Sequence, residues 1–185
     1  KRDGHVDRRA GRLGGRGAAQ RGGVDSQTRR PGRGAVRENA ETGAGNGRNT
    51  INAGNGNNTV TTGNNNDTIT TGSGDDIIVA GNGENIINAG QGNNHITGGS
   101  VKDTINTGSG NDVIEAGNGE NTIDAGDGTN IVTGGTGKDI ITTGSGNDTI
   151  YGGNGSNEIN AGAGNDIVSS GTSHDNIDGG PGYDF

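Results

Sequence analysis

Residues 44–79 read AGNGRNTIN, AGNGNNTVT, TGNNNDTIT and TGSGDDIIV, four nine-residue units that share one pattern. The pattern continues without an insertion or deletion to Asp178, which gives 15 complete units, and a seven-residue stretch, GGPGYDF, follows. The second position is Gly in all 16 units, and the eighth is Ile or Val in all 15 complete ones. The fourth position is Gly except at Asn65, Val101 and Ser173. A repeat of fixed length and strict register indicates a solenoid rather than a globular domain.

Each part of the unit has a structural meaning. Two Gly residues two positions apart permit the positive φ and the close backbone approach that a tight turn needs. The tripeptide around the Ile or Val is typical of a short strand whose middle side chain points inward. Two units would then close one flattened coil of 18 residues. Parallel strands joined by such short turns fit only a solenoid, because an open parallel sheet needs longer connections. The sequence therefore predicts an all-β fold, a parallel β-roll (β-solenoid) of 18-residue coils.

The composition excludes several other classes of protein. The chain has 43 Gly among 185 residues, 23% hydrophobic residues and no Cys. A large globular core is therefore not expected, and neither is a disulfide framework or a Cys-ligated zinc site. No apolar run approaches the roughly 18 residues that a membrane span needs.

Charge divides the chain into two parts. Residues 1–43 hold 11 Lys and Arg against 5 Asp and Glu, whereas residues 44–185 hold 3 against 17. We expect a disordered Arg/Gly-rich tail or linker over 1–43 and the β-roll over 44–185. The basic part contains no Phe, Tyr or Trp that could stack on bases, so nucleic-acid binding is not expected.

The repeat resembles the RTX (repeats-in-toxin) calcium-binding family, whose unit is G-G-x-G-x-D-x-U-x. Near matches are GGTGKD at 134–139 and GGPGYD at 179–184. The resemblance implies that turn carbonyls and the sixth-position Asp residues of neighbouring turns surround Ca²⁺. It implies these metal-site residues: Asp67, Asp76, Asp103, Asp112, Asp139, Asp148, Asp166, Asp175 and Asp184.

The same resemblance implies an extracellular address. Proteins of this family leave the cell unfolded through a type I system and fold outside, where calcium is abundant. We therefore expect a calcium-dependent structural module of a larger secreted protein, such as a toxin, protease, lipase, epimerase or adhesin. Because the apolar core is thin, metal binding is expected to be coupled to folding. Open coil ends also predict end-to-end self-association.

The sixth position departs from the family pattern. Asn alternates with Asp along most of each edge of the roll, so neighbouring turns would offer one carboxylate and one amide, which predicts weak sites. Consecutive Asp residues occur on one edge only at Asp148, Asp166 and Asp184, and the tightest sites are expected there. The other edge carries a predicted ladder of alternating charges at its fifth positions: Glu84, Lys102, Glu120 and Lys138. The alternative for that edge is that Asn stacking and ion pairs partly replace calcium.

Two other functions compete with this interpretation. Outward-facing Thr and Asn side chains could form a flat array of the ice-binding type, or a spacer surface of an adhesin, with little dependence on calcium. Residues such as Ile77 and Glu115 interrupt that array, and Thr is common on solvent-facing strands. Ser173, His174 and Asp175 are contiguous and cannot form the hydrogen-bond relay of a catalytic triad. No catalytic residues are therefore predicted.

Overall fold

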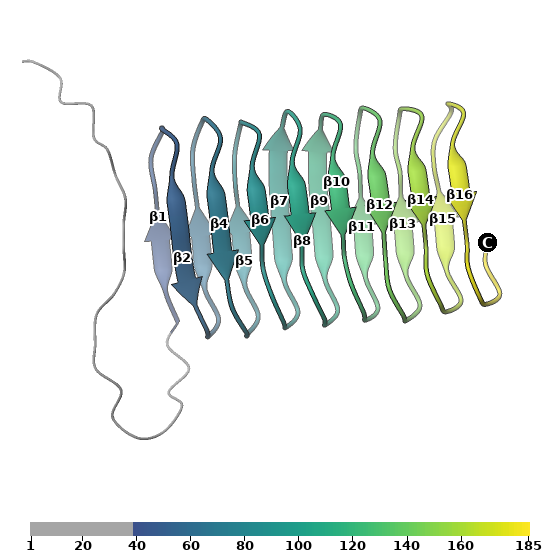
Figure 1. Ribbon diagram of the computed structural model, residues 1–185, viewed down its shortest axis with the longest axis horizontal. Coiled ribbons are helices and arrows are strands. Elements are labelled where there is room, and N and C mark those ends of the chain that lie inside the picture. Colours follow the sequence, from purple (N-terminus) through teal and green to yellow (C-terminus); the bar gives the residue numbers. More distant parts are fainter. Residues whose placement is uncertain (1–38) are drawn as a thin grey trace, which may run out of the picture.

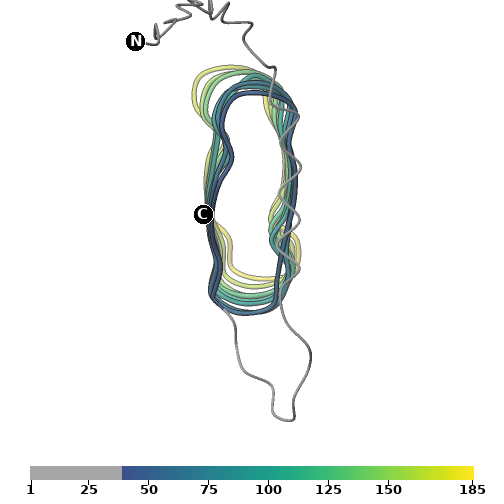
Figure 2. The same cartoon turned by 90° about the vertical axis from the view of Figure 1, so that its left-hand side faces the viewer.

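Each nine-residue unit forms one turn and one short strand, and successive strands lie on opposite sides of the roll (Figure 1). The computed structural model describes residues 39–185. The predicted β-roll is confirmed: the strands form two parallel sheets of eight strands each. Viewed along the axis, the coils superpose as one flattened ring whose long sides are the two sheets (Figure 2).

The first sheet contains the odd-numbered strands in chain order. They are β1 (Glu41–Gly43), β3 (Thr59–Thr61), β5 (Ile77–Val79), β7 (His95–Ser100), β9 (Val113–Asn118), β11 (Ile131–Thr133), β13 (Thr149–Tyr151) and β15 (Ile167–Ser169). The second sheet contains the even-numbered strands. They are β2 (Thr50–Gly54), β4 (Thr68–Thr71), β6 (Ile86–Asn88), β8 (Thr104–Asn106), β10 (Thr122–Asp124), β12 (Ile140–Thr142), β14 (Glu158–Asn160) and β16 (Asn176–Asp178).

Strand register follows the repeat, with one irregularity between β2 and β4, where Gly54 pairs with Thr71. The other paired strand residues lie 18 positions apart along the chain, as Ile114 and Val132 do. The turns stack in the same register, for example through the bridges Ser73↔Gln91 and Ser109↔Asp127. Equivalent positions of the repeat therefore form rows along the axis, so each turn position lies beside the same position of the next coil on that edge.

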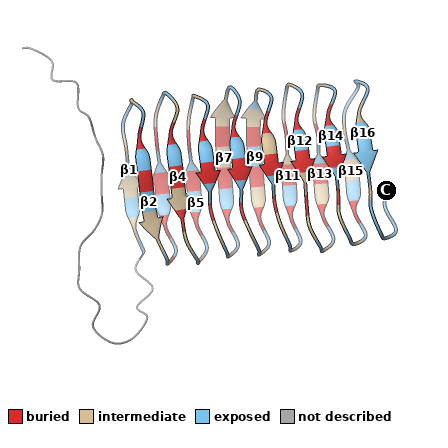
Figure 3. Cartoon of the chain, in the orientation of Figure 1, coloured by how far each residue is buried: buried red, intermediate tan, exposed pale blue. Residues whose placement is uncertain are grey.

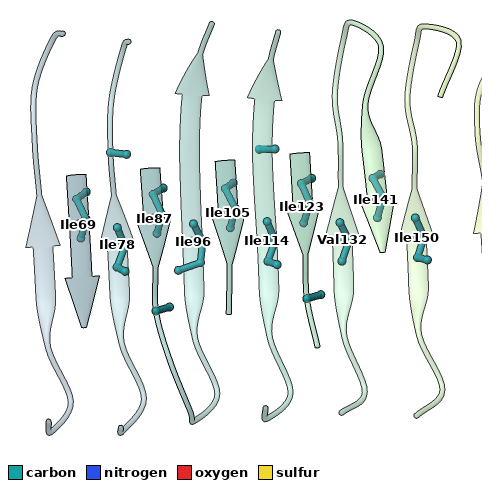
Figure 4. Close-up of a cluster of buried hydrophobic side chains, with 14 of the residues drawn as sticks. Ile69, Ile78, Ile87, Ile96, Ile105, Ile114, Ile123, Val132, Ile141 and Ile150 are labelled. Atoms are coloured by element: carbon teal, nitrogen blue, oxygen red, sulfur yellow. The ribbon is translucent and has the colours of Figure 1, made fainter. Parts of the chain in front are cut away.

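The core is a narrow double row of aliphatic side chains between the sheets. Thirteen eighth-position residues, from Ile51 to Ile159, are at most 2% exposed and belong to the core cluster. Figure 3 shows the buried strand segments in red, and Figure 4 shows the eighth-position side chains from Ile69 to Ile150. The first position adds the buried alanines Ala80, Ala89, Ala116, Ala125 and Ala161. The eighth-position residues at the C-terminal end are less covered, because β15 and β16 are the outermost strands on that side: Val168 is partly buried and Ile177 is 46% exposed.

The paired structure begins N-terminal to Ala44. Strand β1 pairs with β3 through Glu41↔Thr59 and Thr42↔Val60, and the amide of Ala40 donates to Asn58 Oδ1 at 2.9 Å. The prediction of a disordered tail otherwise lies outside the described residues.

Val101 has a backbone conformation that costs free energy. It occupies a fourth position, where all but three units have Gly, and its φ is 84°, a region in which a β-branched residue is strained. Asn65 has a φ of 86° at the same repeat position, but Asn tolerates it better.

We expect Val101→Gly to stabilise the calcium-loaded roll by about 1 kcal/mol, because the strain disappears and the lost side chain is 48% exposed. Chemical denaturation at saturating calcium measures this. An unchanged or lower midpoint would contradict the assignment of strain.

Candidate metal centre

The sixth-position side chains lie inside the turns and link one coil to the next. We call the turns before even-numbered strands the first edge and those before odd-numbered strands the second edge. On both edges the backbone N–H of a sixth-position residue donates to Oδ1 of the sixth-position residue one coil on, as Asn49 does to Asp67 (2.7 Å) and Asn58 to Asp76 (2.7 Å). From Asn49 to Asp166 these side chains are at most 6% exposed. Each edge thus contains a continuous buried ladder of Asn and Asp.

In the Asn turns, the amide nitrogen of the side chain, Nδ2, also makes hydrogen bonds. Asn58 Nδ2 donates to the carbonyl oxygens of Gly54 (3.0 Å) and Gly56 (2.9 Å), which are the second and fourth residues of its own turn. Asn49, Asn85, Asn94 and Asn130 make the same pair of contacts, at 2.8–3.5 Å. Asn121 and Asn157 instead donate to one carbonyl of their own turn and one of the next coil: Gly134 and Ser170, respectively. The turn carbonyls therefore converge on one polar atom.

The Asp turns have a carboxylate oxygen, Oδ2, where the Asn turns have the amide nitrogen Nδ2. Oδ1 of each Asp accepts the ladder hydrogen bond, so Oδ2 corresponds to the Asn amide nitrogen, and a carboxylate oxygen has no proton to donate. Seven Oδ2 atoms are buried without any hydrogen-bond partner: those of Asp67, Asp76, Asp103, Asp112, Asp139, Asp148 and Asp166. A buried, unpaired carboxylate oxygen beside carbonyl oxygens requires a cation or a proton.

Burial perturbs the acidity of four of these seven carboxyl groups. Burial raises the pKa of Asp103 from 3.8 to about 6, and hydrogen bonds from Asn85 only partly oppose it. Burial also raises the pKa values of Asp112, Asp139 and Asp148, and the Asp166 carboxyl adds to the effect on Asp148. These carboxyl groups thus retain protons more strongly than ordinary Asp residues when no cation is present.

Within residues 39–185, no three His, Cys, Asp or Glu side chains come together as a ready-made metal cluster. Along each edge most neighbouring Asp residues are separated by an Asn turn. Of the nine predicted metal-site residues, the seven with unpaired Oδ2 atoms are buried, Asp175 is partly buried and Asp184 is exposed.

The second edge carries an additional ladder on its outer side. The fifth-position residues Asn57, Asp75, Asn93 and Asn111 accept through Oδ1 the backbone N–H of the fifth-position residue one coil on, at 2.8–3.0 Å. These side chains are exposed, so water can satisfy their remaining polar atoms. On the first edge, Glu84, Lys102, Glu120 and Lys138 are exposed as well, and their alternating-charge ladder stays a prediction.

Comparison with known families agrees with this geometry. The family model for the RTX calcium-binding nonapeptide repeat, in four copies, matches the chain repeatedly, at residues 43–78, 61–96, 70–105, 97–132, 124–159, 133–168 and 151–185. The chain belongs to this family of calcium-binding repeats, and its repeats form a β-roll. No curated protein and no solved structure matches it. Residues 39–185 contain no helix able to cross a membrane.

We expect the metal-free chain to gain β-sheet circular dichroism signal as the pH falls from 7 toward 5. The folded pKa of Asp103, about 6, lies above its ordinary value of 3.8, so protonation favours the folded state and the gain is complete near the ordinary value. A protonated carboxyl can donate to a turn carbonyl as the Asn amide does. Calcium competes with the proton, so its affinity should fall below about pH 6. A β signal that falls steadily between pH 7 and 5 in metal-free buffer would contradict this.

Proposed function

We propose that residues 39–185 are a structural module that folds on binding Ca²⁺ and stiffens a larger secreted protein. The observation that carries this proposal is the row of seven buried Asp Oδ2 atoms without a partner, at the repeat position where Asn amides donate to turn carbonyls. The proposed ligands are these carboxylates, with Asp175 and Asp184 in the last coil.

The donor set suits calcium better than other metals. It offers oxygen alone, mostly from carbonyls, with few charges, whereas zinc and copper prefer nitrogen or sulfur. Magnesium requires a near-ideal octahedron of ligands and keeps much of its water, which a buried, closely packed turn does not favour. One carboxylate per site predicts low affinity, with a Kd of about 10⁻⁴–10⁻³ M, the range of extracellular calcium modules.

Low affinity fits the proposed route of export. At the low calcium concentration inside a cell the sites would be empty, and the buried carboxylates would oppose folding. Outside, millimolar calcium would fill them. The secreted address and type I export are inferred from the family, as is the absence of catalysis. Adhesin spacers and ice-binding surfaces stay an alternative, and thermal hysteresis measurements test the ice-binding version.

Thermal unfolding as a function of calcium concentration tests the proposal. Above the Kd, each tenfold rise in free calcium should add about 1.4 kcal/mol of stability per bound ion, so the melting temperature should climb steadily. Magnesium at equal ionic strength should raise it far less. Equal melting temperatures in calcium, magnesium and metal-free buffer would reject the proposal.

A further inference from the structure

The roll contains two kinds of coil, and they alternate. From residue 44 to residue 151, every unit with Asn at the sixth position has Ala at the first, and every unit with Asp has Thr or Gly there. The true sequence period is therefore 36 residues, or two coils. The Asn coils have Ala44, Ala53, Ala80, Ala89, Ala116 and Ala125, and the Asp coils have Thr62, Thr71, Gly98, Thr107, Gly134 and Thr143.

An Asn coil fills the centre of its own turns. Asn58 Nδ2 lies 3.0 and 2.9 Å from the carbonyl oxygens of Gly54 and Gly56, and 2.9 Å from Asp76 Oδ1 in the next coil. Asn49 Nδ2 has the equivalent three oxygens, including Asp67 Oδ1 at 3.0 Å. An amide group thus occupies the point on which two carbonyls and a carboxylate converge. A cation placed there would have to displace it.

An Asp coil leaves the same point without a donor, even where a hydroxyl lies beside it. The Thr107 hydroxyl is adjacent to the Asp112 carboxylate but donates to the Ala125 carbonyl of the next coil at 3.0 Å. Thr62, Thr71 and Thr143 donate in the same direction, to the first-position carbonyls of Ala80, Ala89 and Ala161. Beside Asp103 and Asp139, the first-position residue is Gly and provides no side chain at all.

We infer that only the Asp turns bind Ca²⁺, and that the Asn turns are calcium-independent rungs in which a side-chain amide replaces the ion. This inference rests on the proposed function and specifies its sites. It places binding turns two coils apart along each edge, about 10 Å, which reduces repulsion between the buried charges. The exception is Asp148, Asp166 and Asp184, which follow one another on the second edge. The chain then binds about seven ions at the unpaired Oδ2 atoms, and up to two more at Asp175 and Asp184 in the last coil, rather than one for each of its 16 turns.

Converting Asn turns to Asp turns tests this inference. In saturating calcium, the variant N85D/N94D/N121D/N130D should bind about four more ions per chain than the natural sequence, as counted by equilibrium dialysis. The control carries the same added charge at exposed fifth positions, N57D/N93D/N111D/N147D, and should bind the same number as the natural sequence within one ion. An unchanged count in the first variant, or an equal gain in the control, would overturn the inference.

The reverse change covers the case in which the first variant does not fold. D103N/D112N/D139N/D148N should bind about four fewer ions and retain more β signal in chelator than the natural chain. Loss of that signal in chelator, with an undiminished ion count in calcium, would overturn the inference. A natural chain that binds no calcium would instead refute the proposed function, and a natural chain that binds about 16 ions would refute only the assignment of the Asn turns.

Discussion

In excess chelator at neutral pH, the chain is expected to lose most of its β-sheet circular dichroism signal and to recover it in millimolar calcium. Seven buried carboxylate oxygens without a partner would otherwise have to remain charged inside the roll. Desolvating an unpaired charge costs several kcal/mol. The apolar core whose burial must offset this cost is a double row of Ile, Val and Ala. Cooperative unfolding exposes all seven carboxylates to water at once and so removes this desolvation cost.

The control for this experiment is magnesium, or a monovalent salt, at matched ionic strength, because screening alone also weakens repulsion between surface carboxylates. Neither should restore the signal at the concentration at which calcium does. A spectrum that is the same in chelator and in calcium would show that the roll does not need the ion to fold.

Gly126→Ala should destabilise the calcium-loaded roll by about 3 kcal/mol, a large effect for one methyl group. Gly126 is a second-position residue with a φ of 66°, and a Cβ there would overlap the carbonyl oxygen of Gly108 in the neighbouring coil. Backbone cannot yield as a side-chain end can, so the coils would have to separate. The Gly126 carbonyl, which accepts a hydrogen bond from Asn130 Nδ2 at 3.1 Å, would move as the coils separate. Denaturant unfolding in saturating calcium measures the loss.

Gly54→Ala is the matched control. Gly54 has the same repeat position, a φ of 75° and the same hydrogen bond, from Asn58 Nδ2 to its carbonyl, but no described atom lies within 4 Å of its Cβ direction. Among residues 39–185, therefore, only the backbone strain opposes the added methyl group, and we expect a loss of about 1 kcal/mol. Equal losses at the two positions would show that close coil packing does not determine the glycine requirement.

The architecture could be predicted from the sequence because the repeat encodes it redundantly. Each Ile or Val at the eighth position, such as Ile105, lies between exposed or partly exposed neighbours, and this alternation identifies an inward strand residue. Gly at the second position indicates a turn, and unbroken spacing predicts the register. None of these inferences depends on how side chains meet inside the turns.

The interior of the turns could not be predicted in the same way. The sequence indicates that Asn alternates with Asp, but not that Asn58 Nδ2 lies between two carbonyls of its own turn while Asp76 Oδ2 has no partner. Whether a sixth-position side chain makes a hydrogen bond within its own turn or to the next coil depends on the backbone geometry of the turn. The order of residues in the repeat does not specify that geometry. One signal was present, however: Ala44 with Asn49 and Thr62 with Asp67 begin a 36-residue period that pairs the first position with the sixth.

The number of calcium ions bound per chain, determined together with the β-sheet signal in one titration, tests the central claim most directly. We predict that the β signal rises cooperatively over millimolar calcium and is complete when about seven ions are bound, the number of buried Asp oxygens without a partner. A chain that reaches its full β signal with no ion bound would contradict the claim that calcium binding folds the roll.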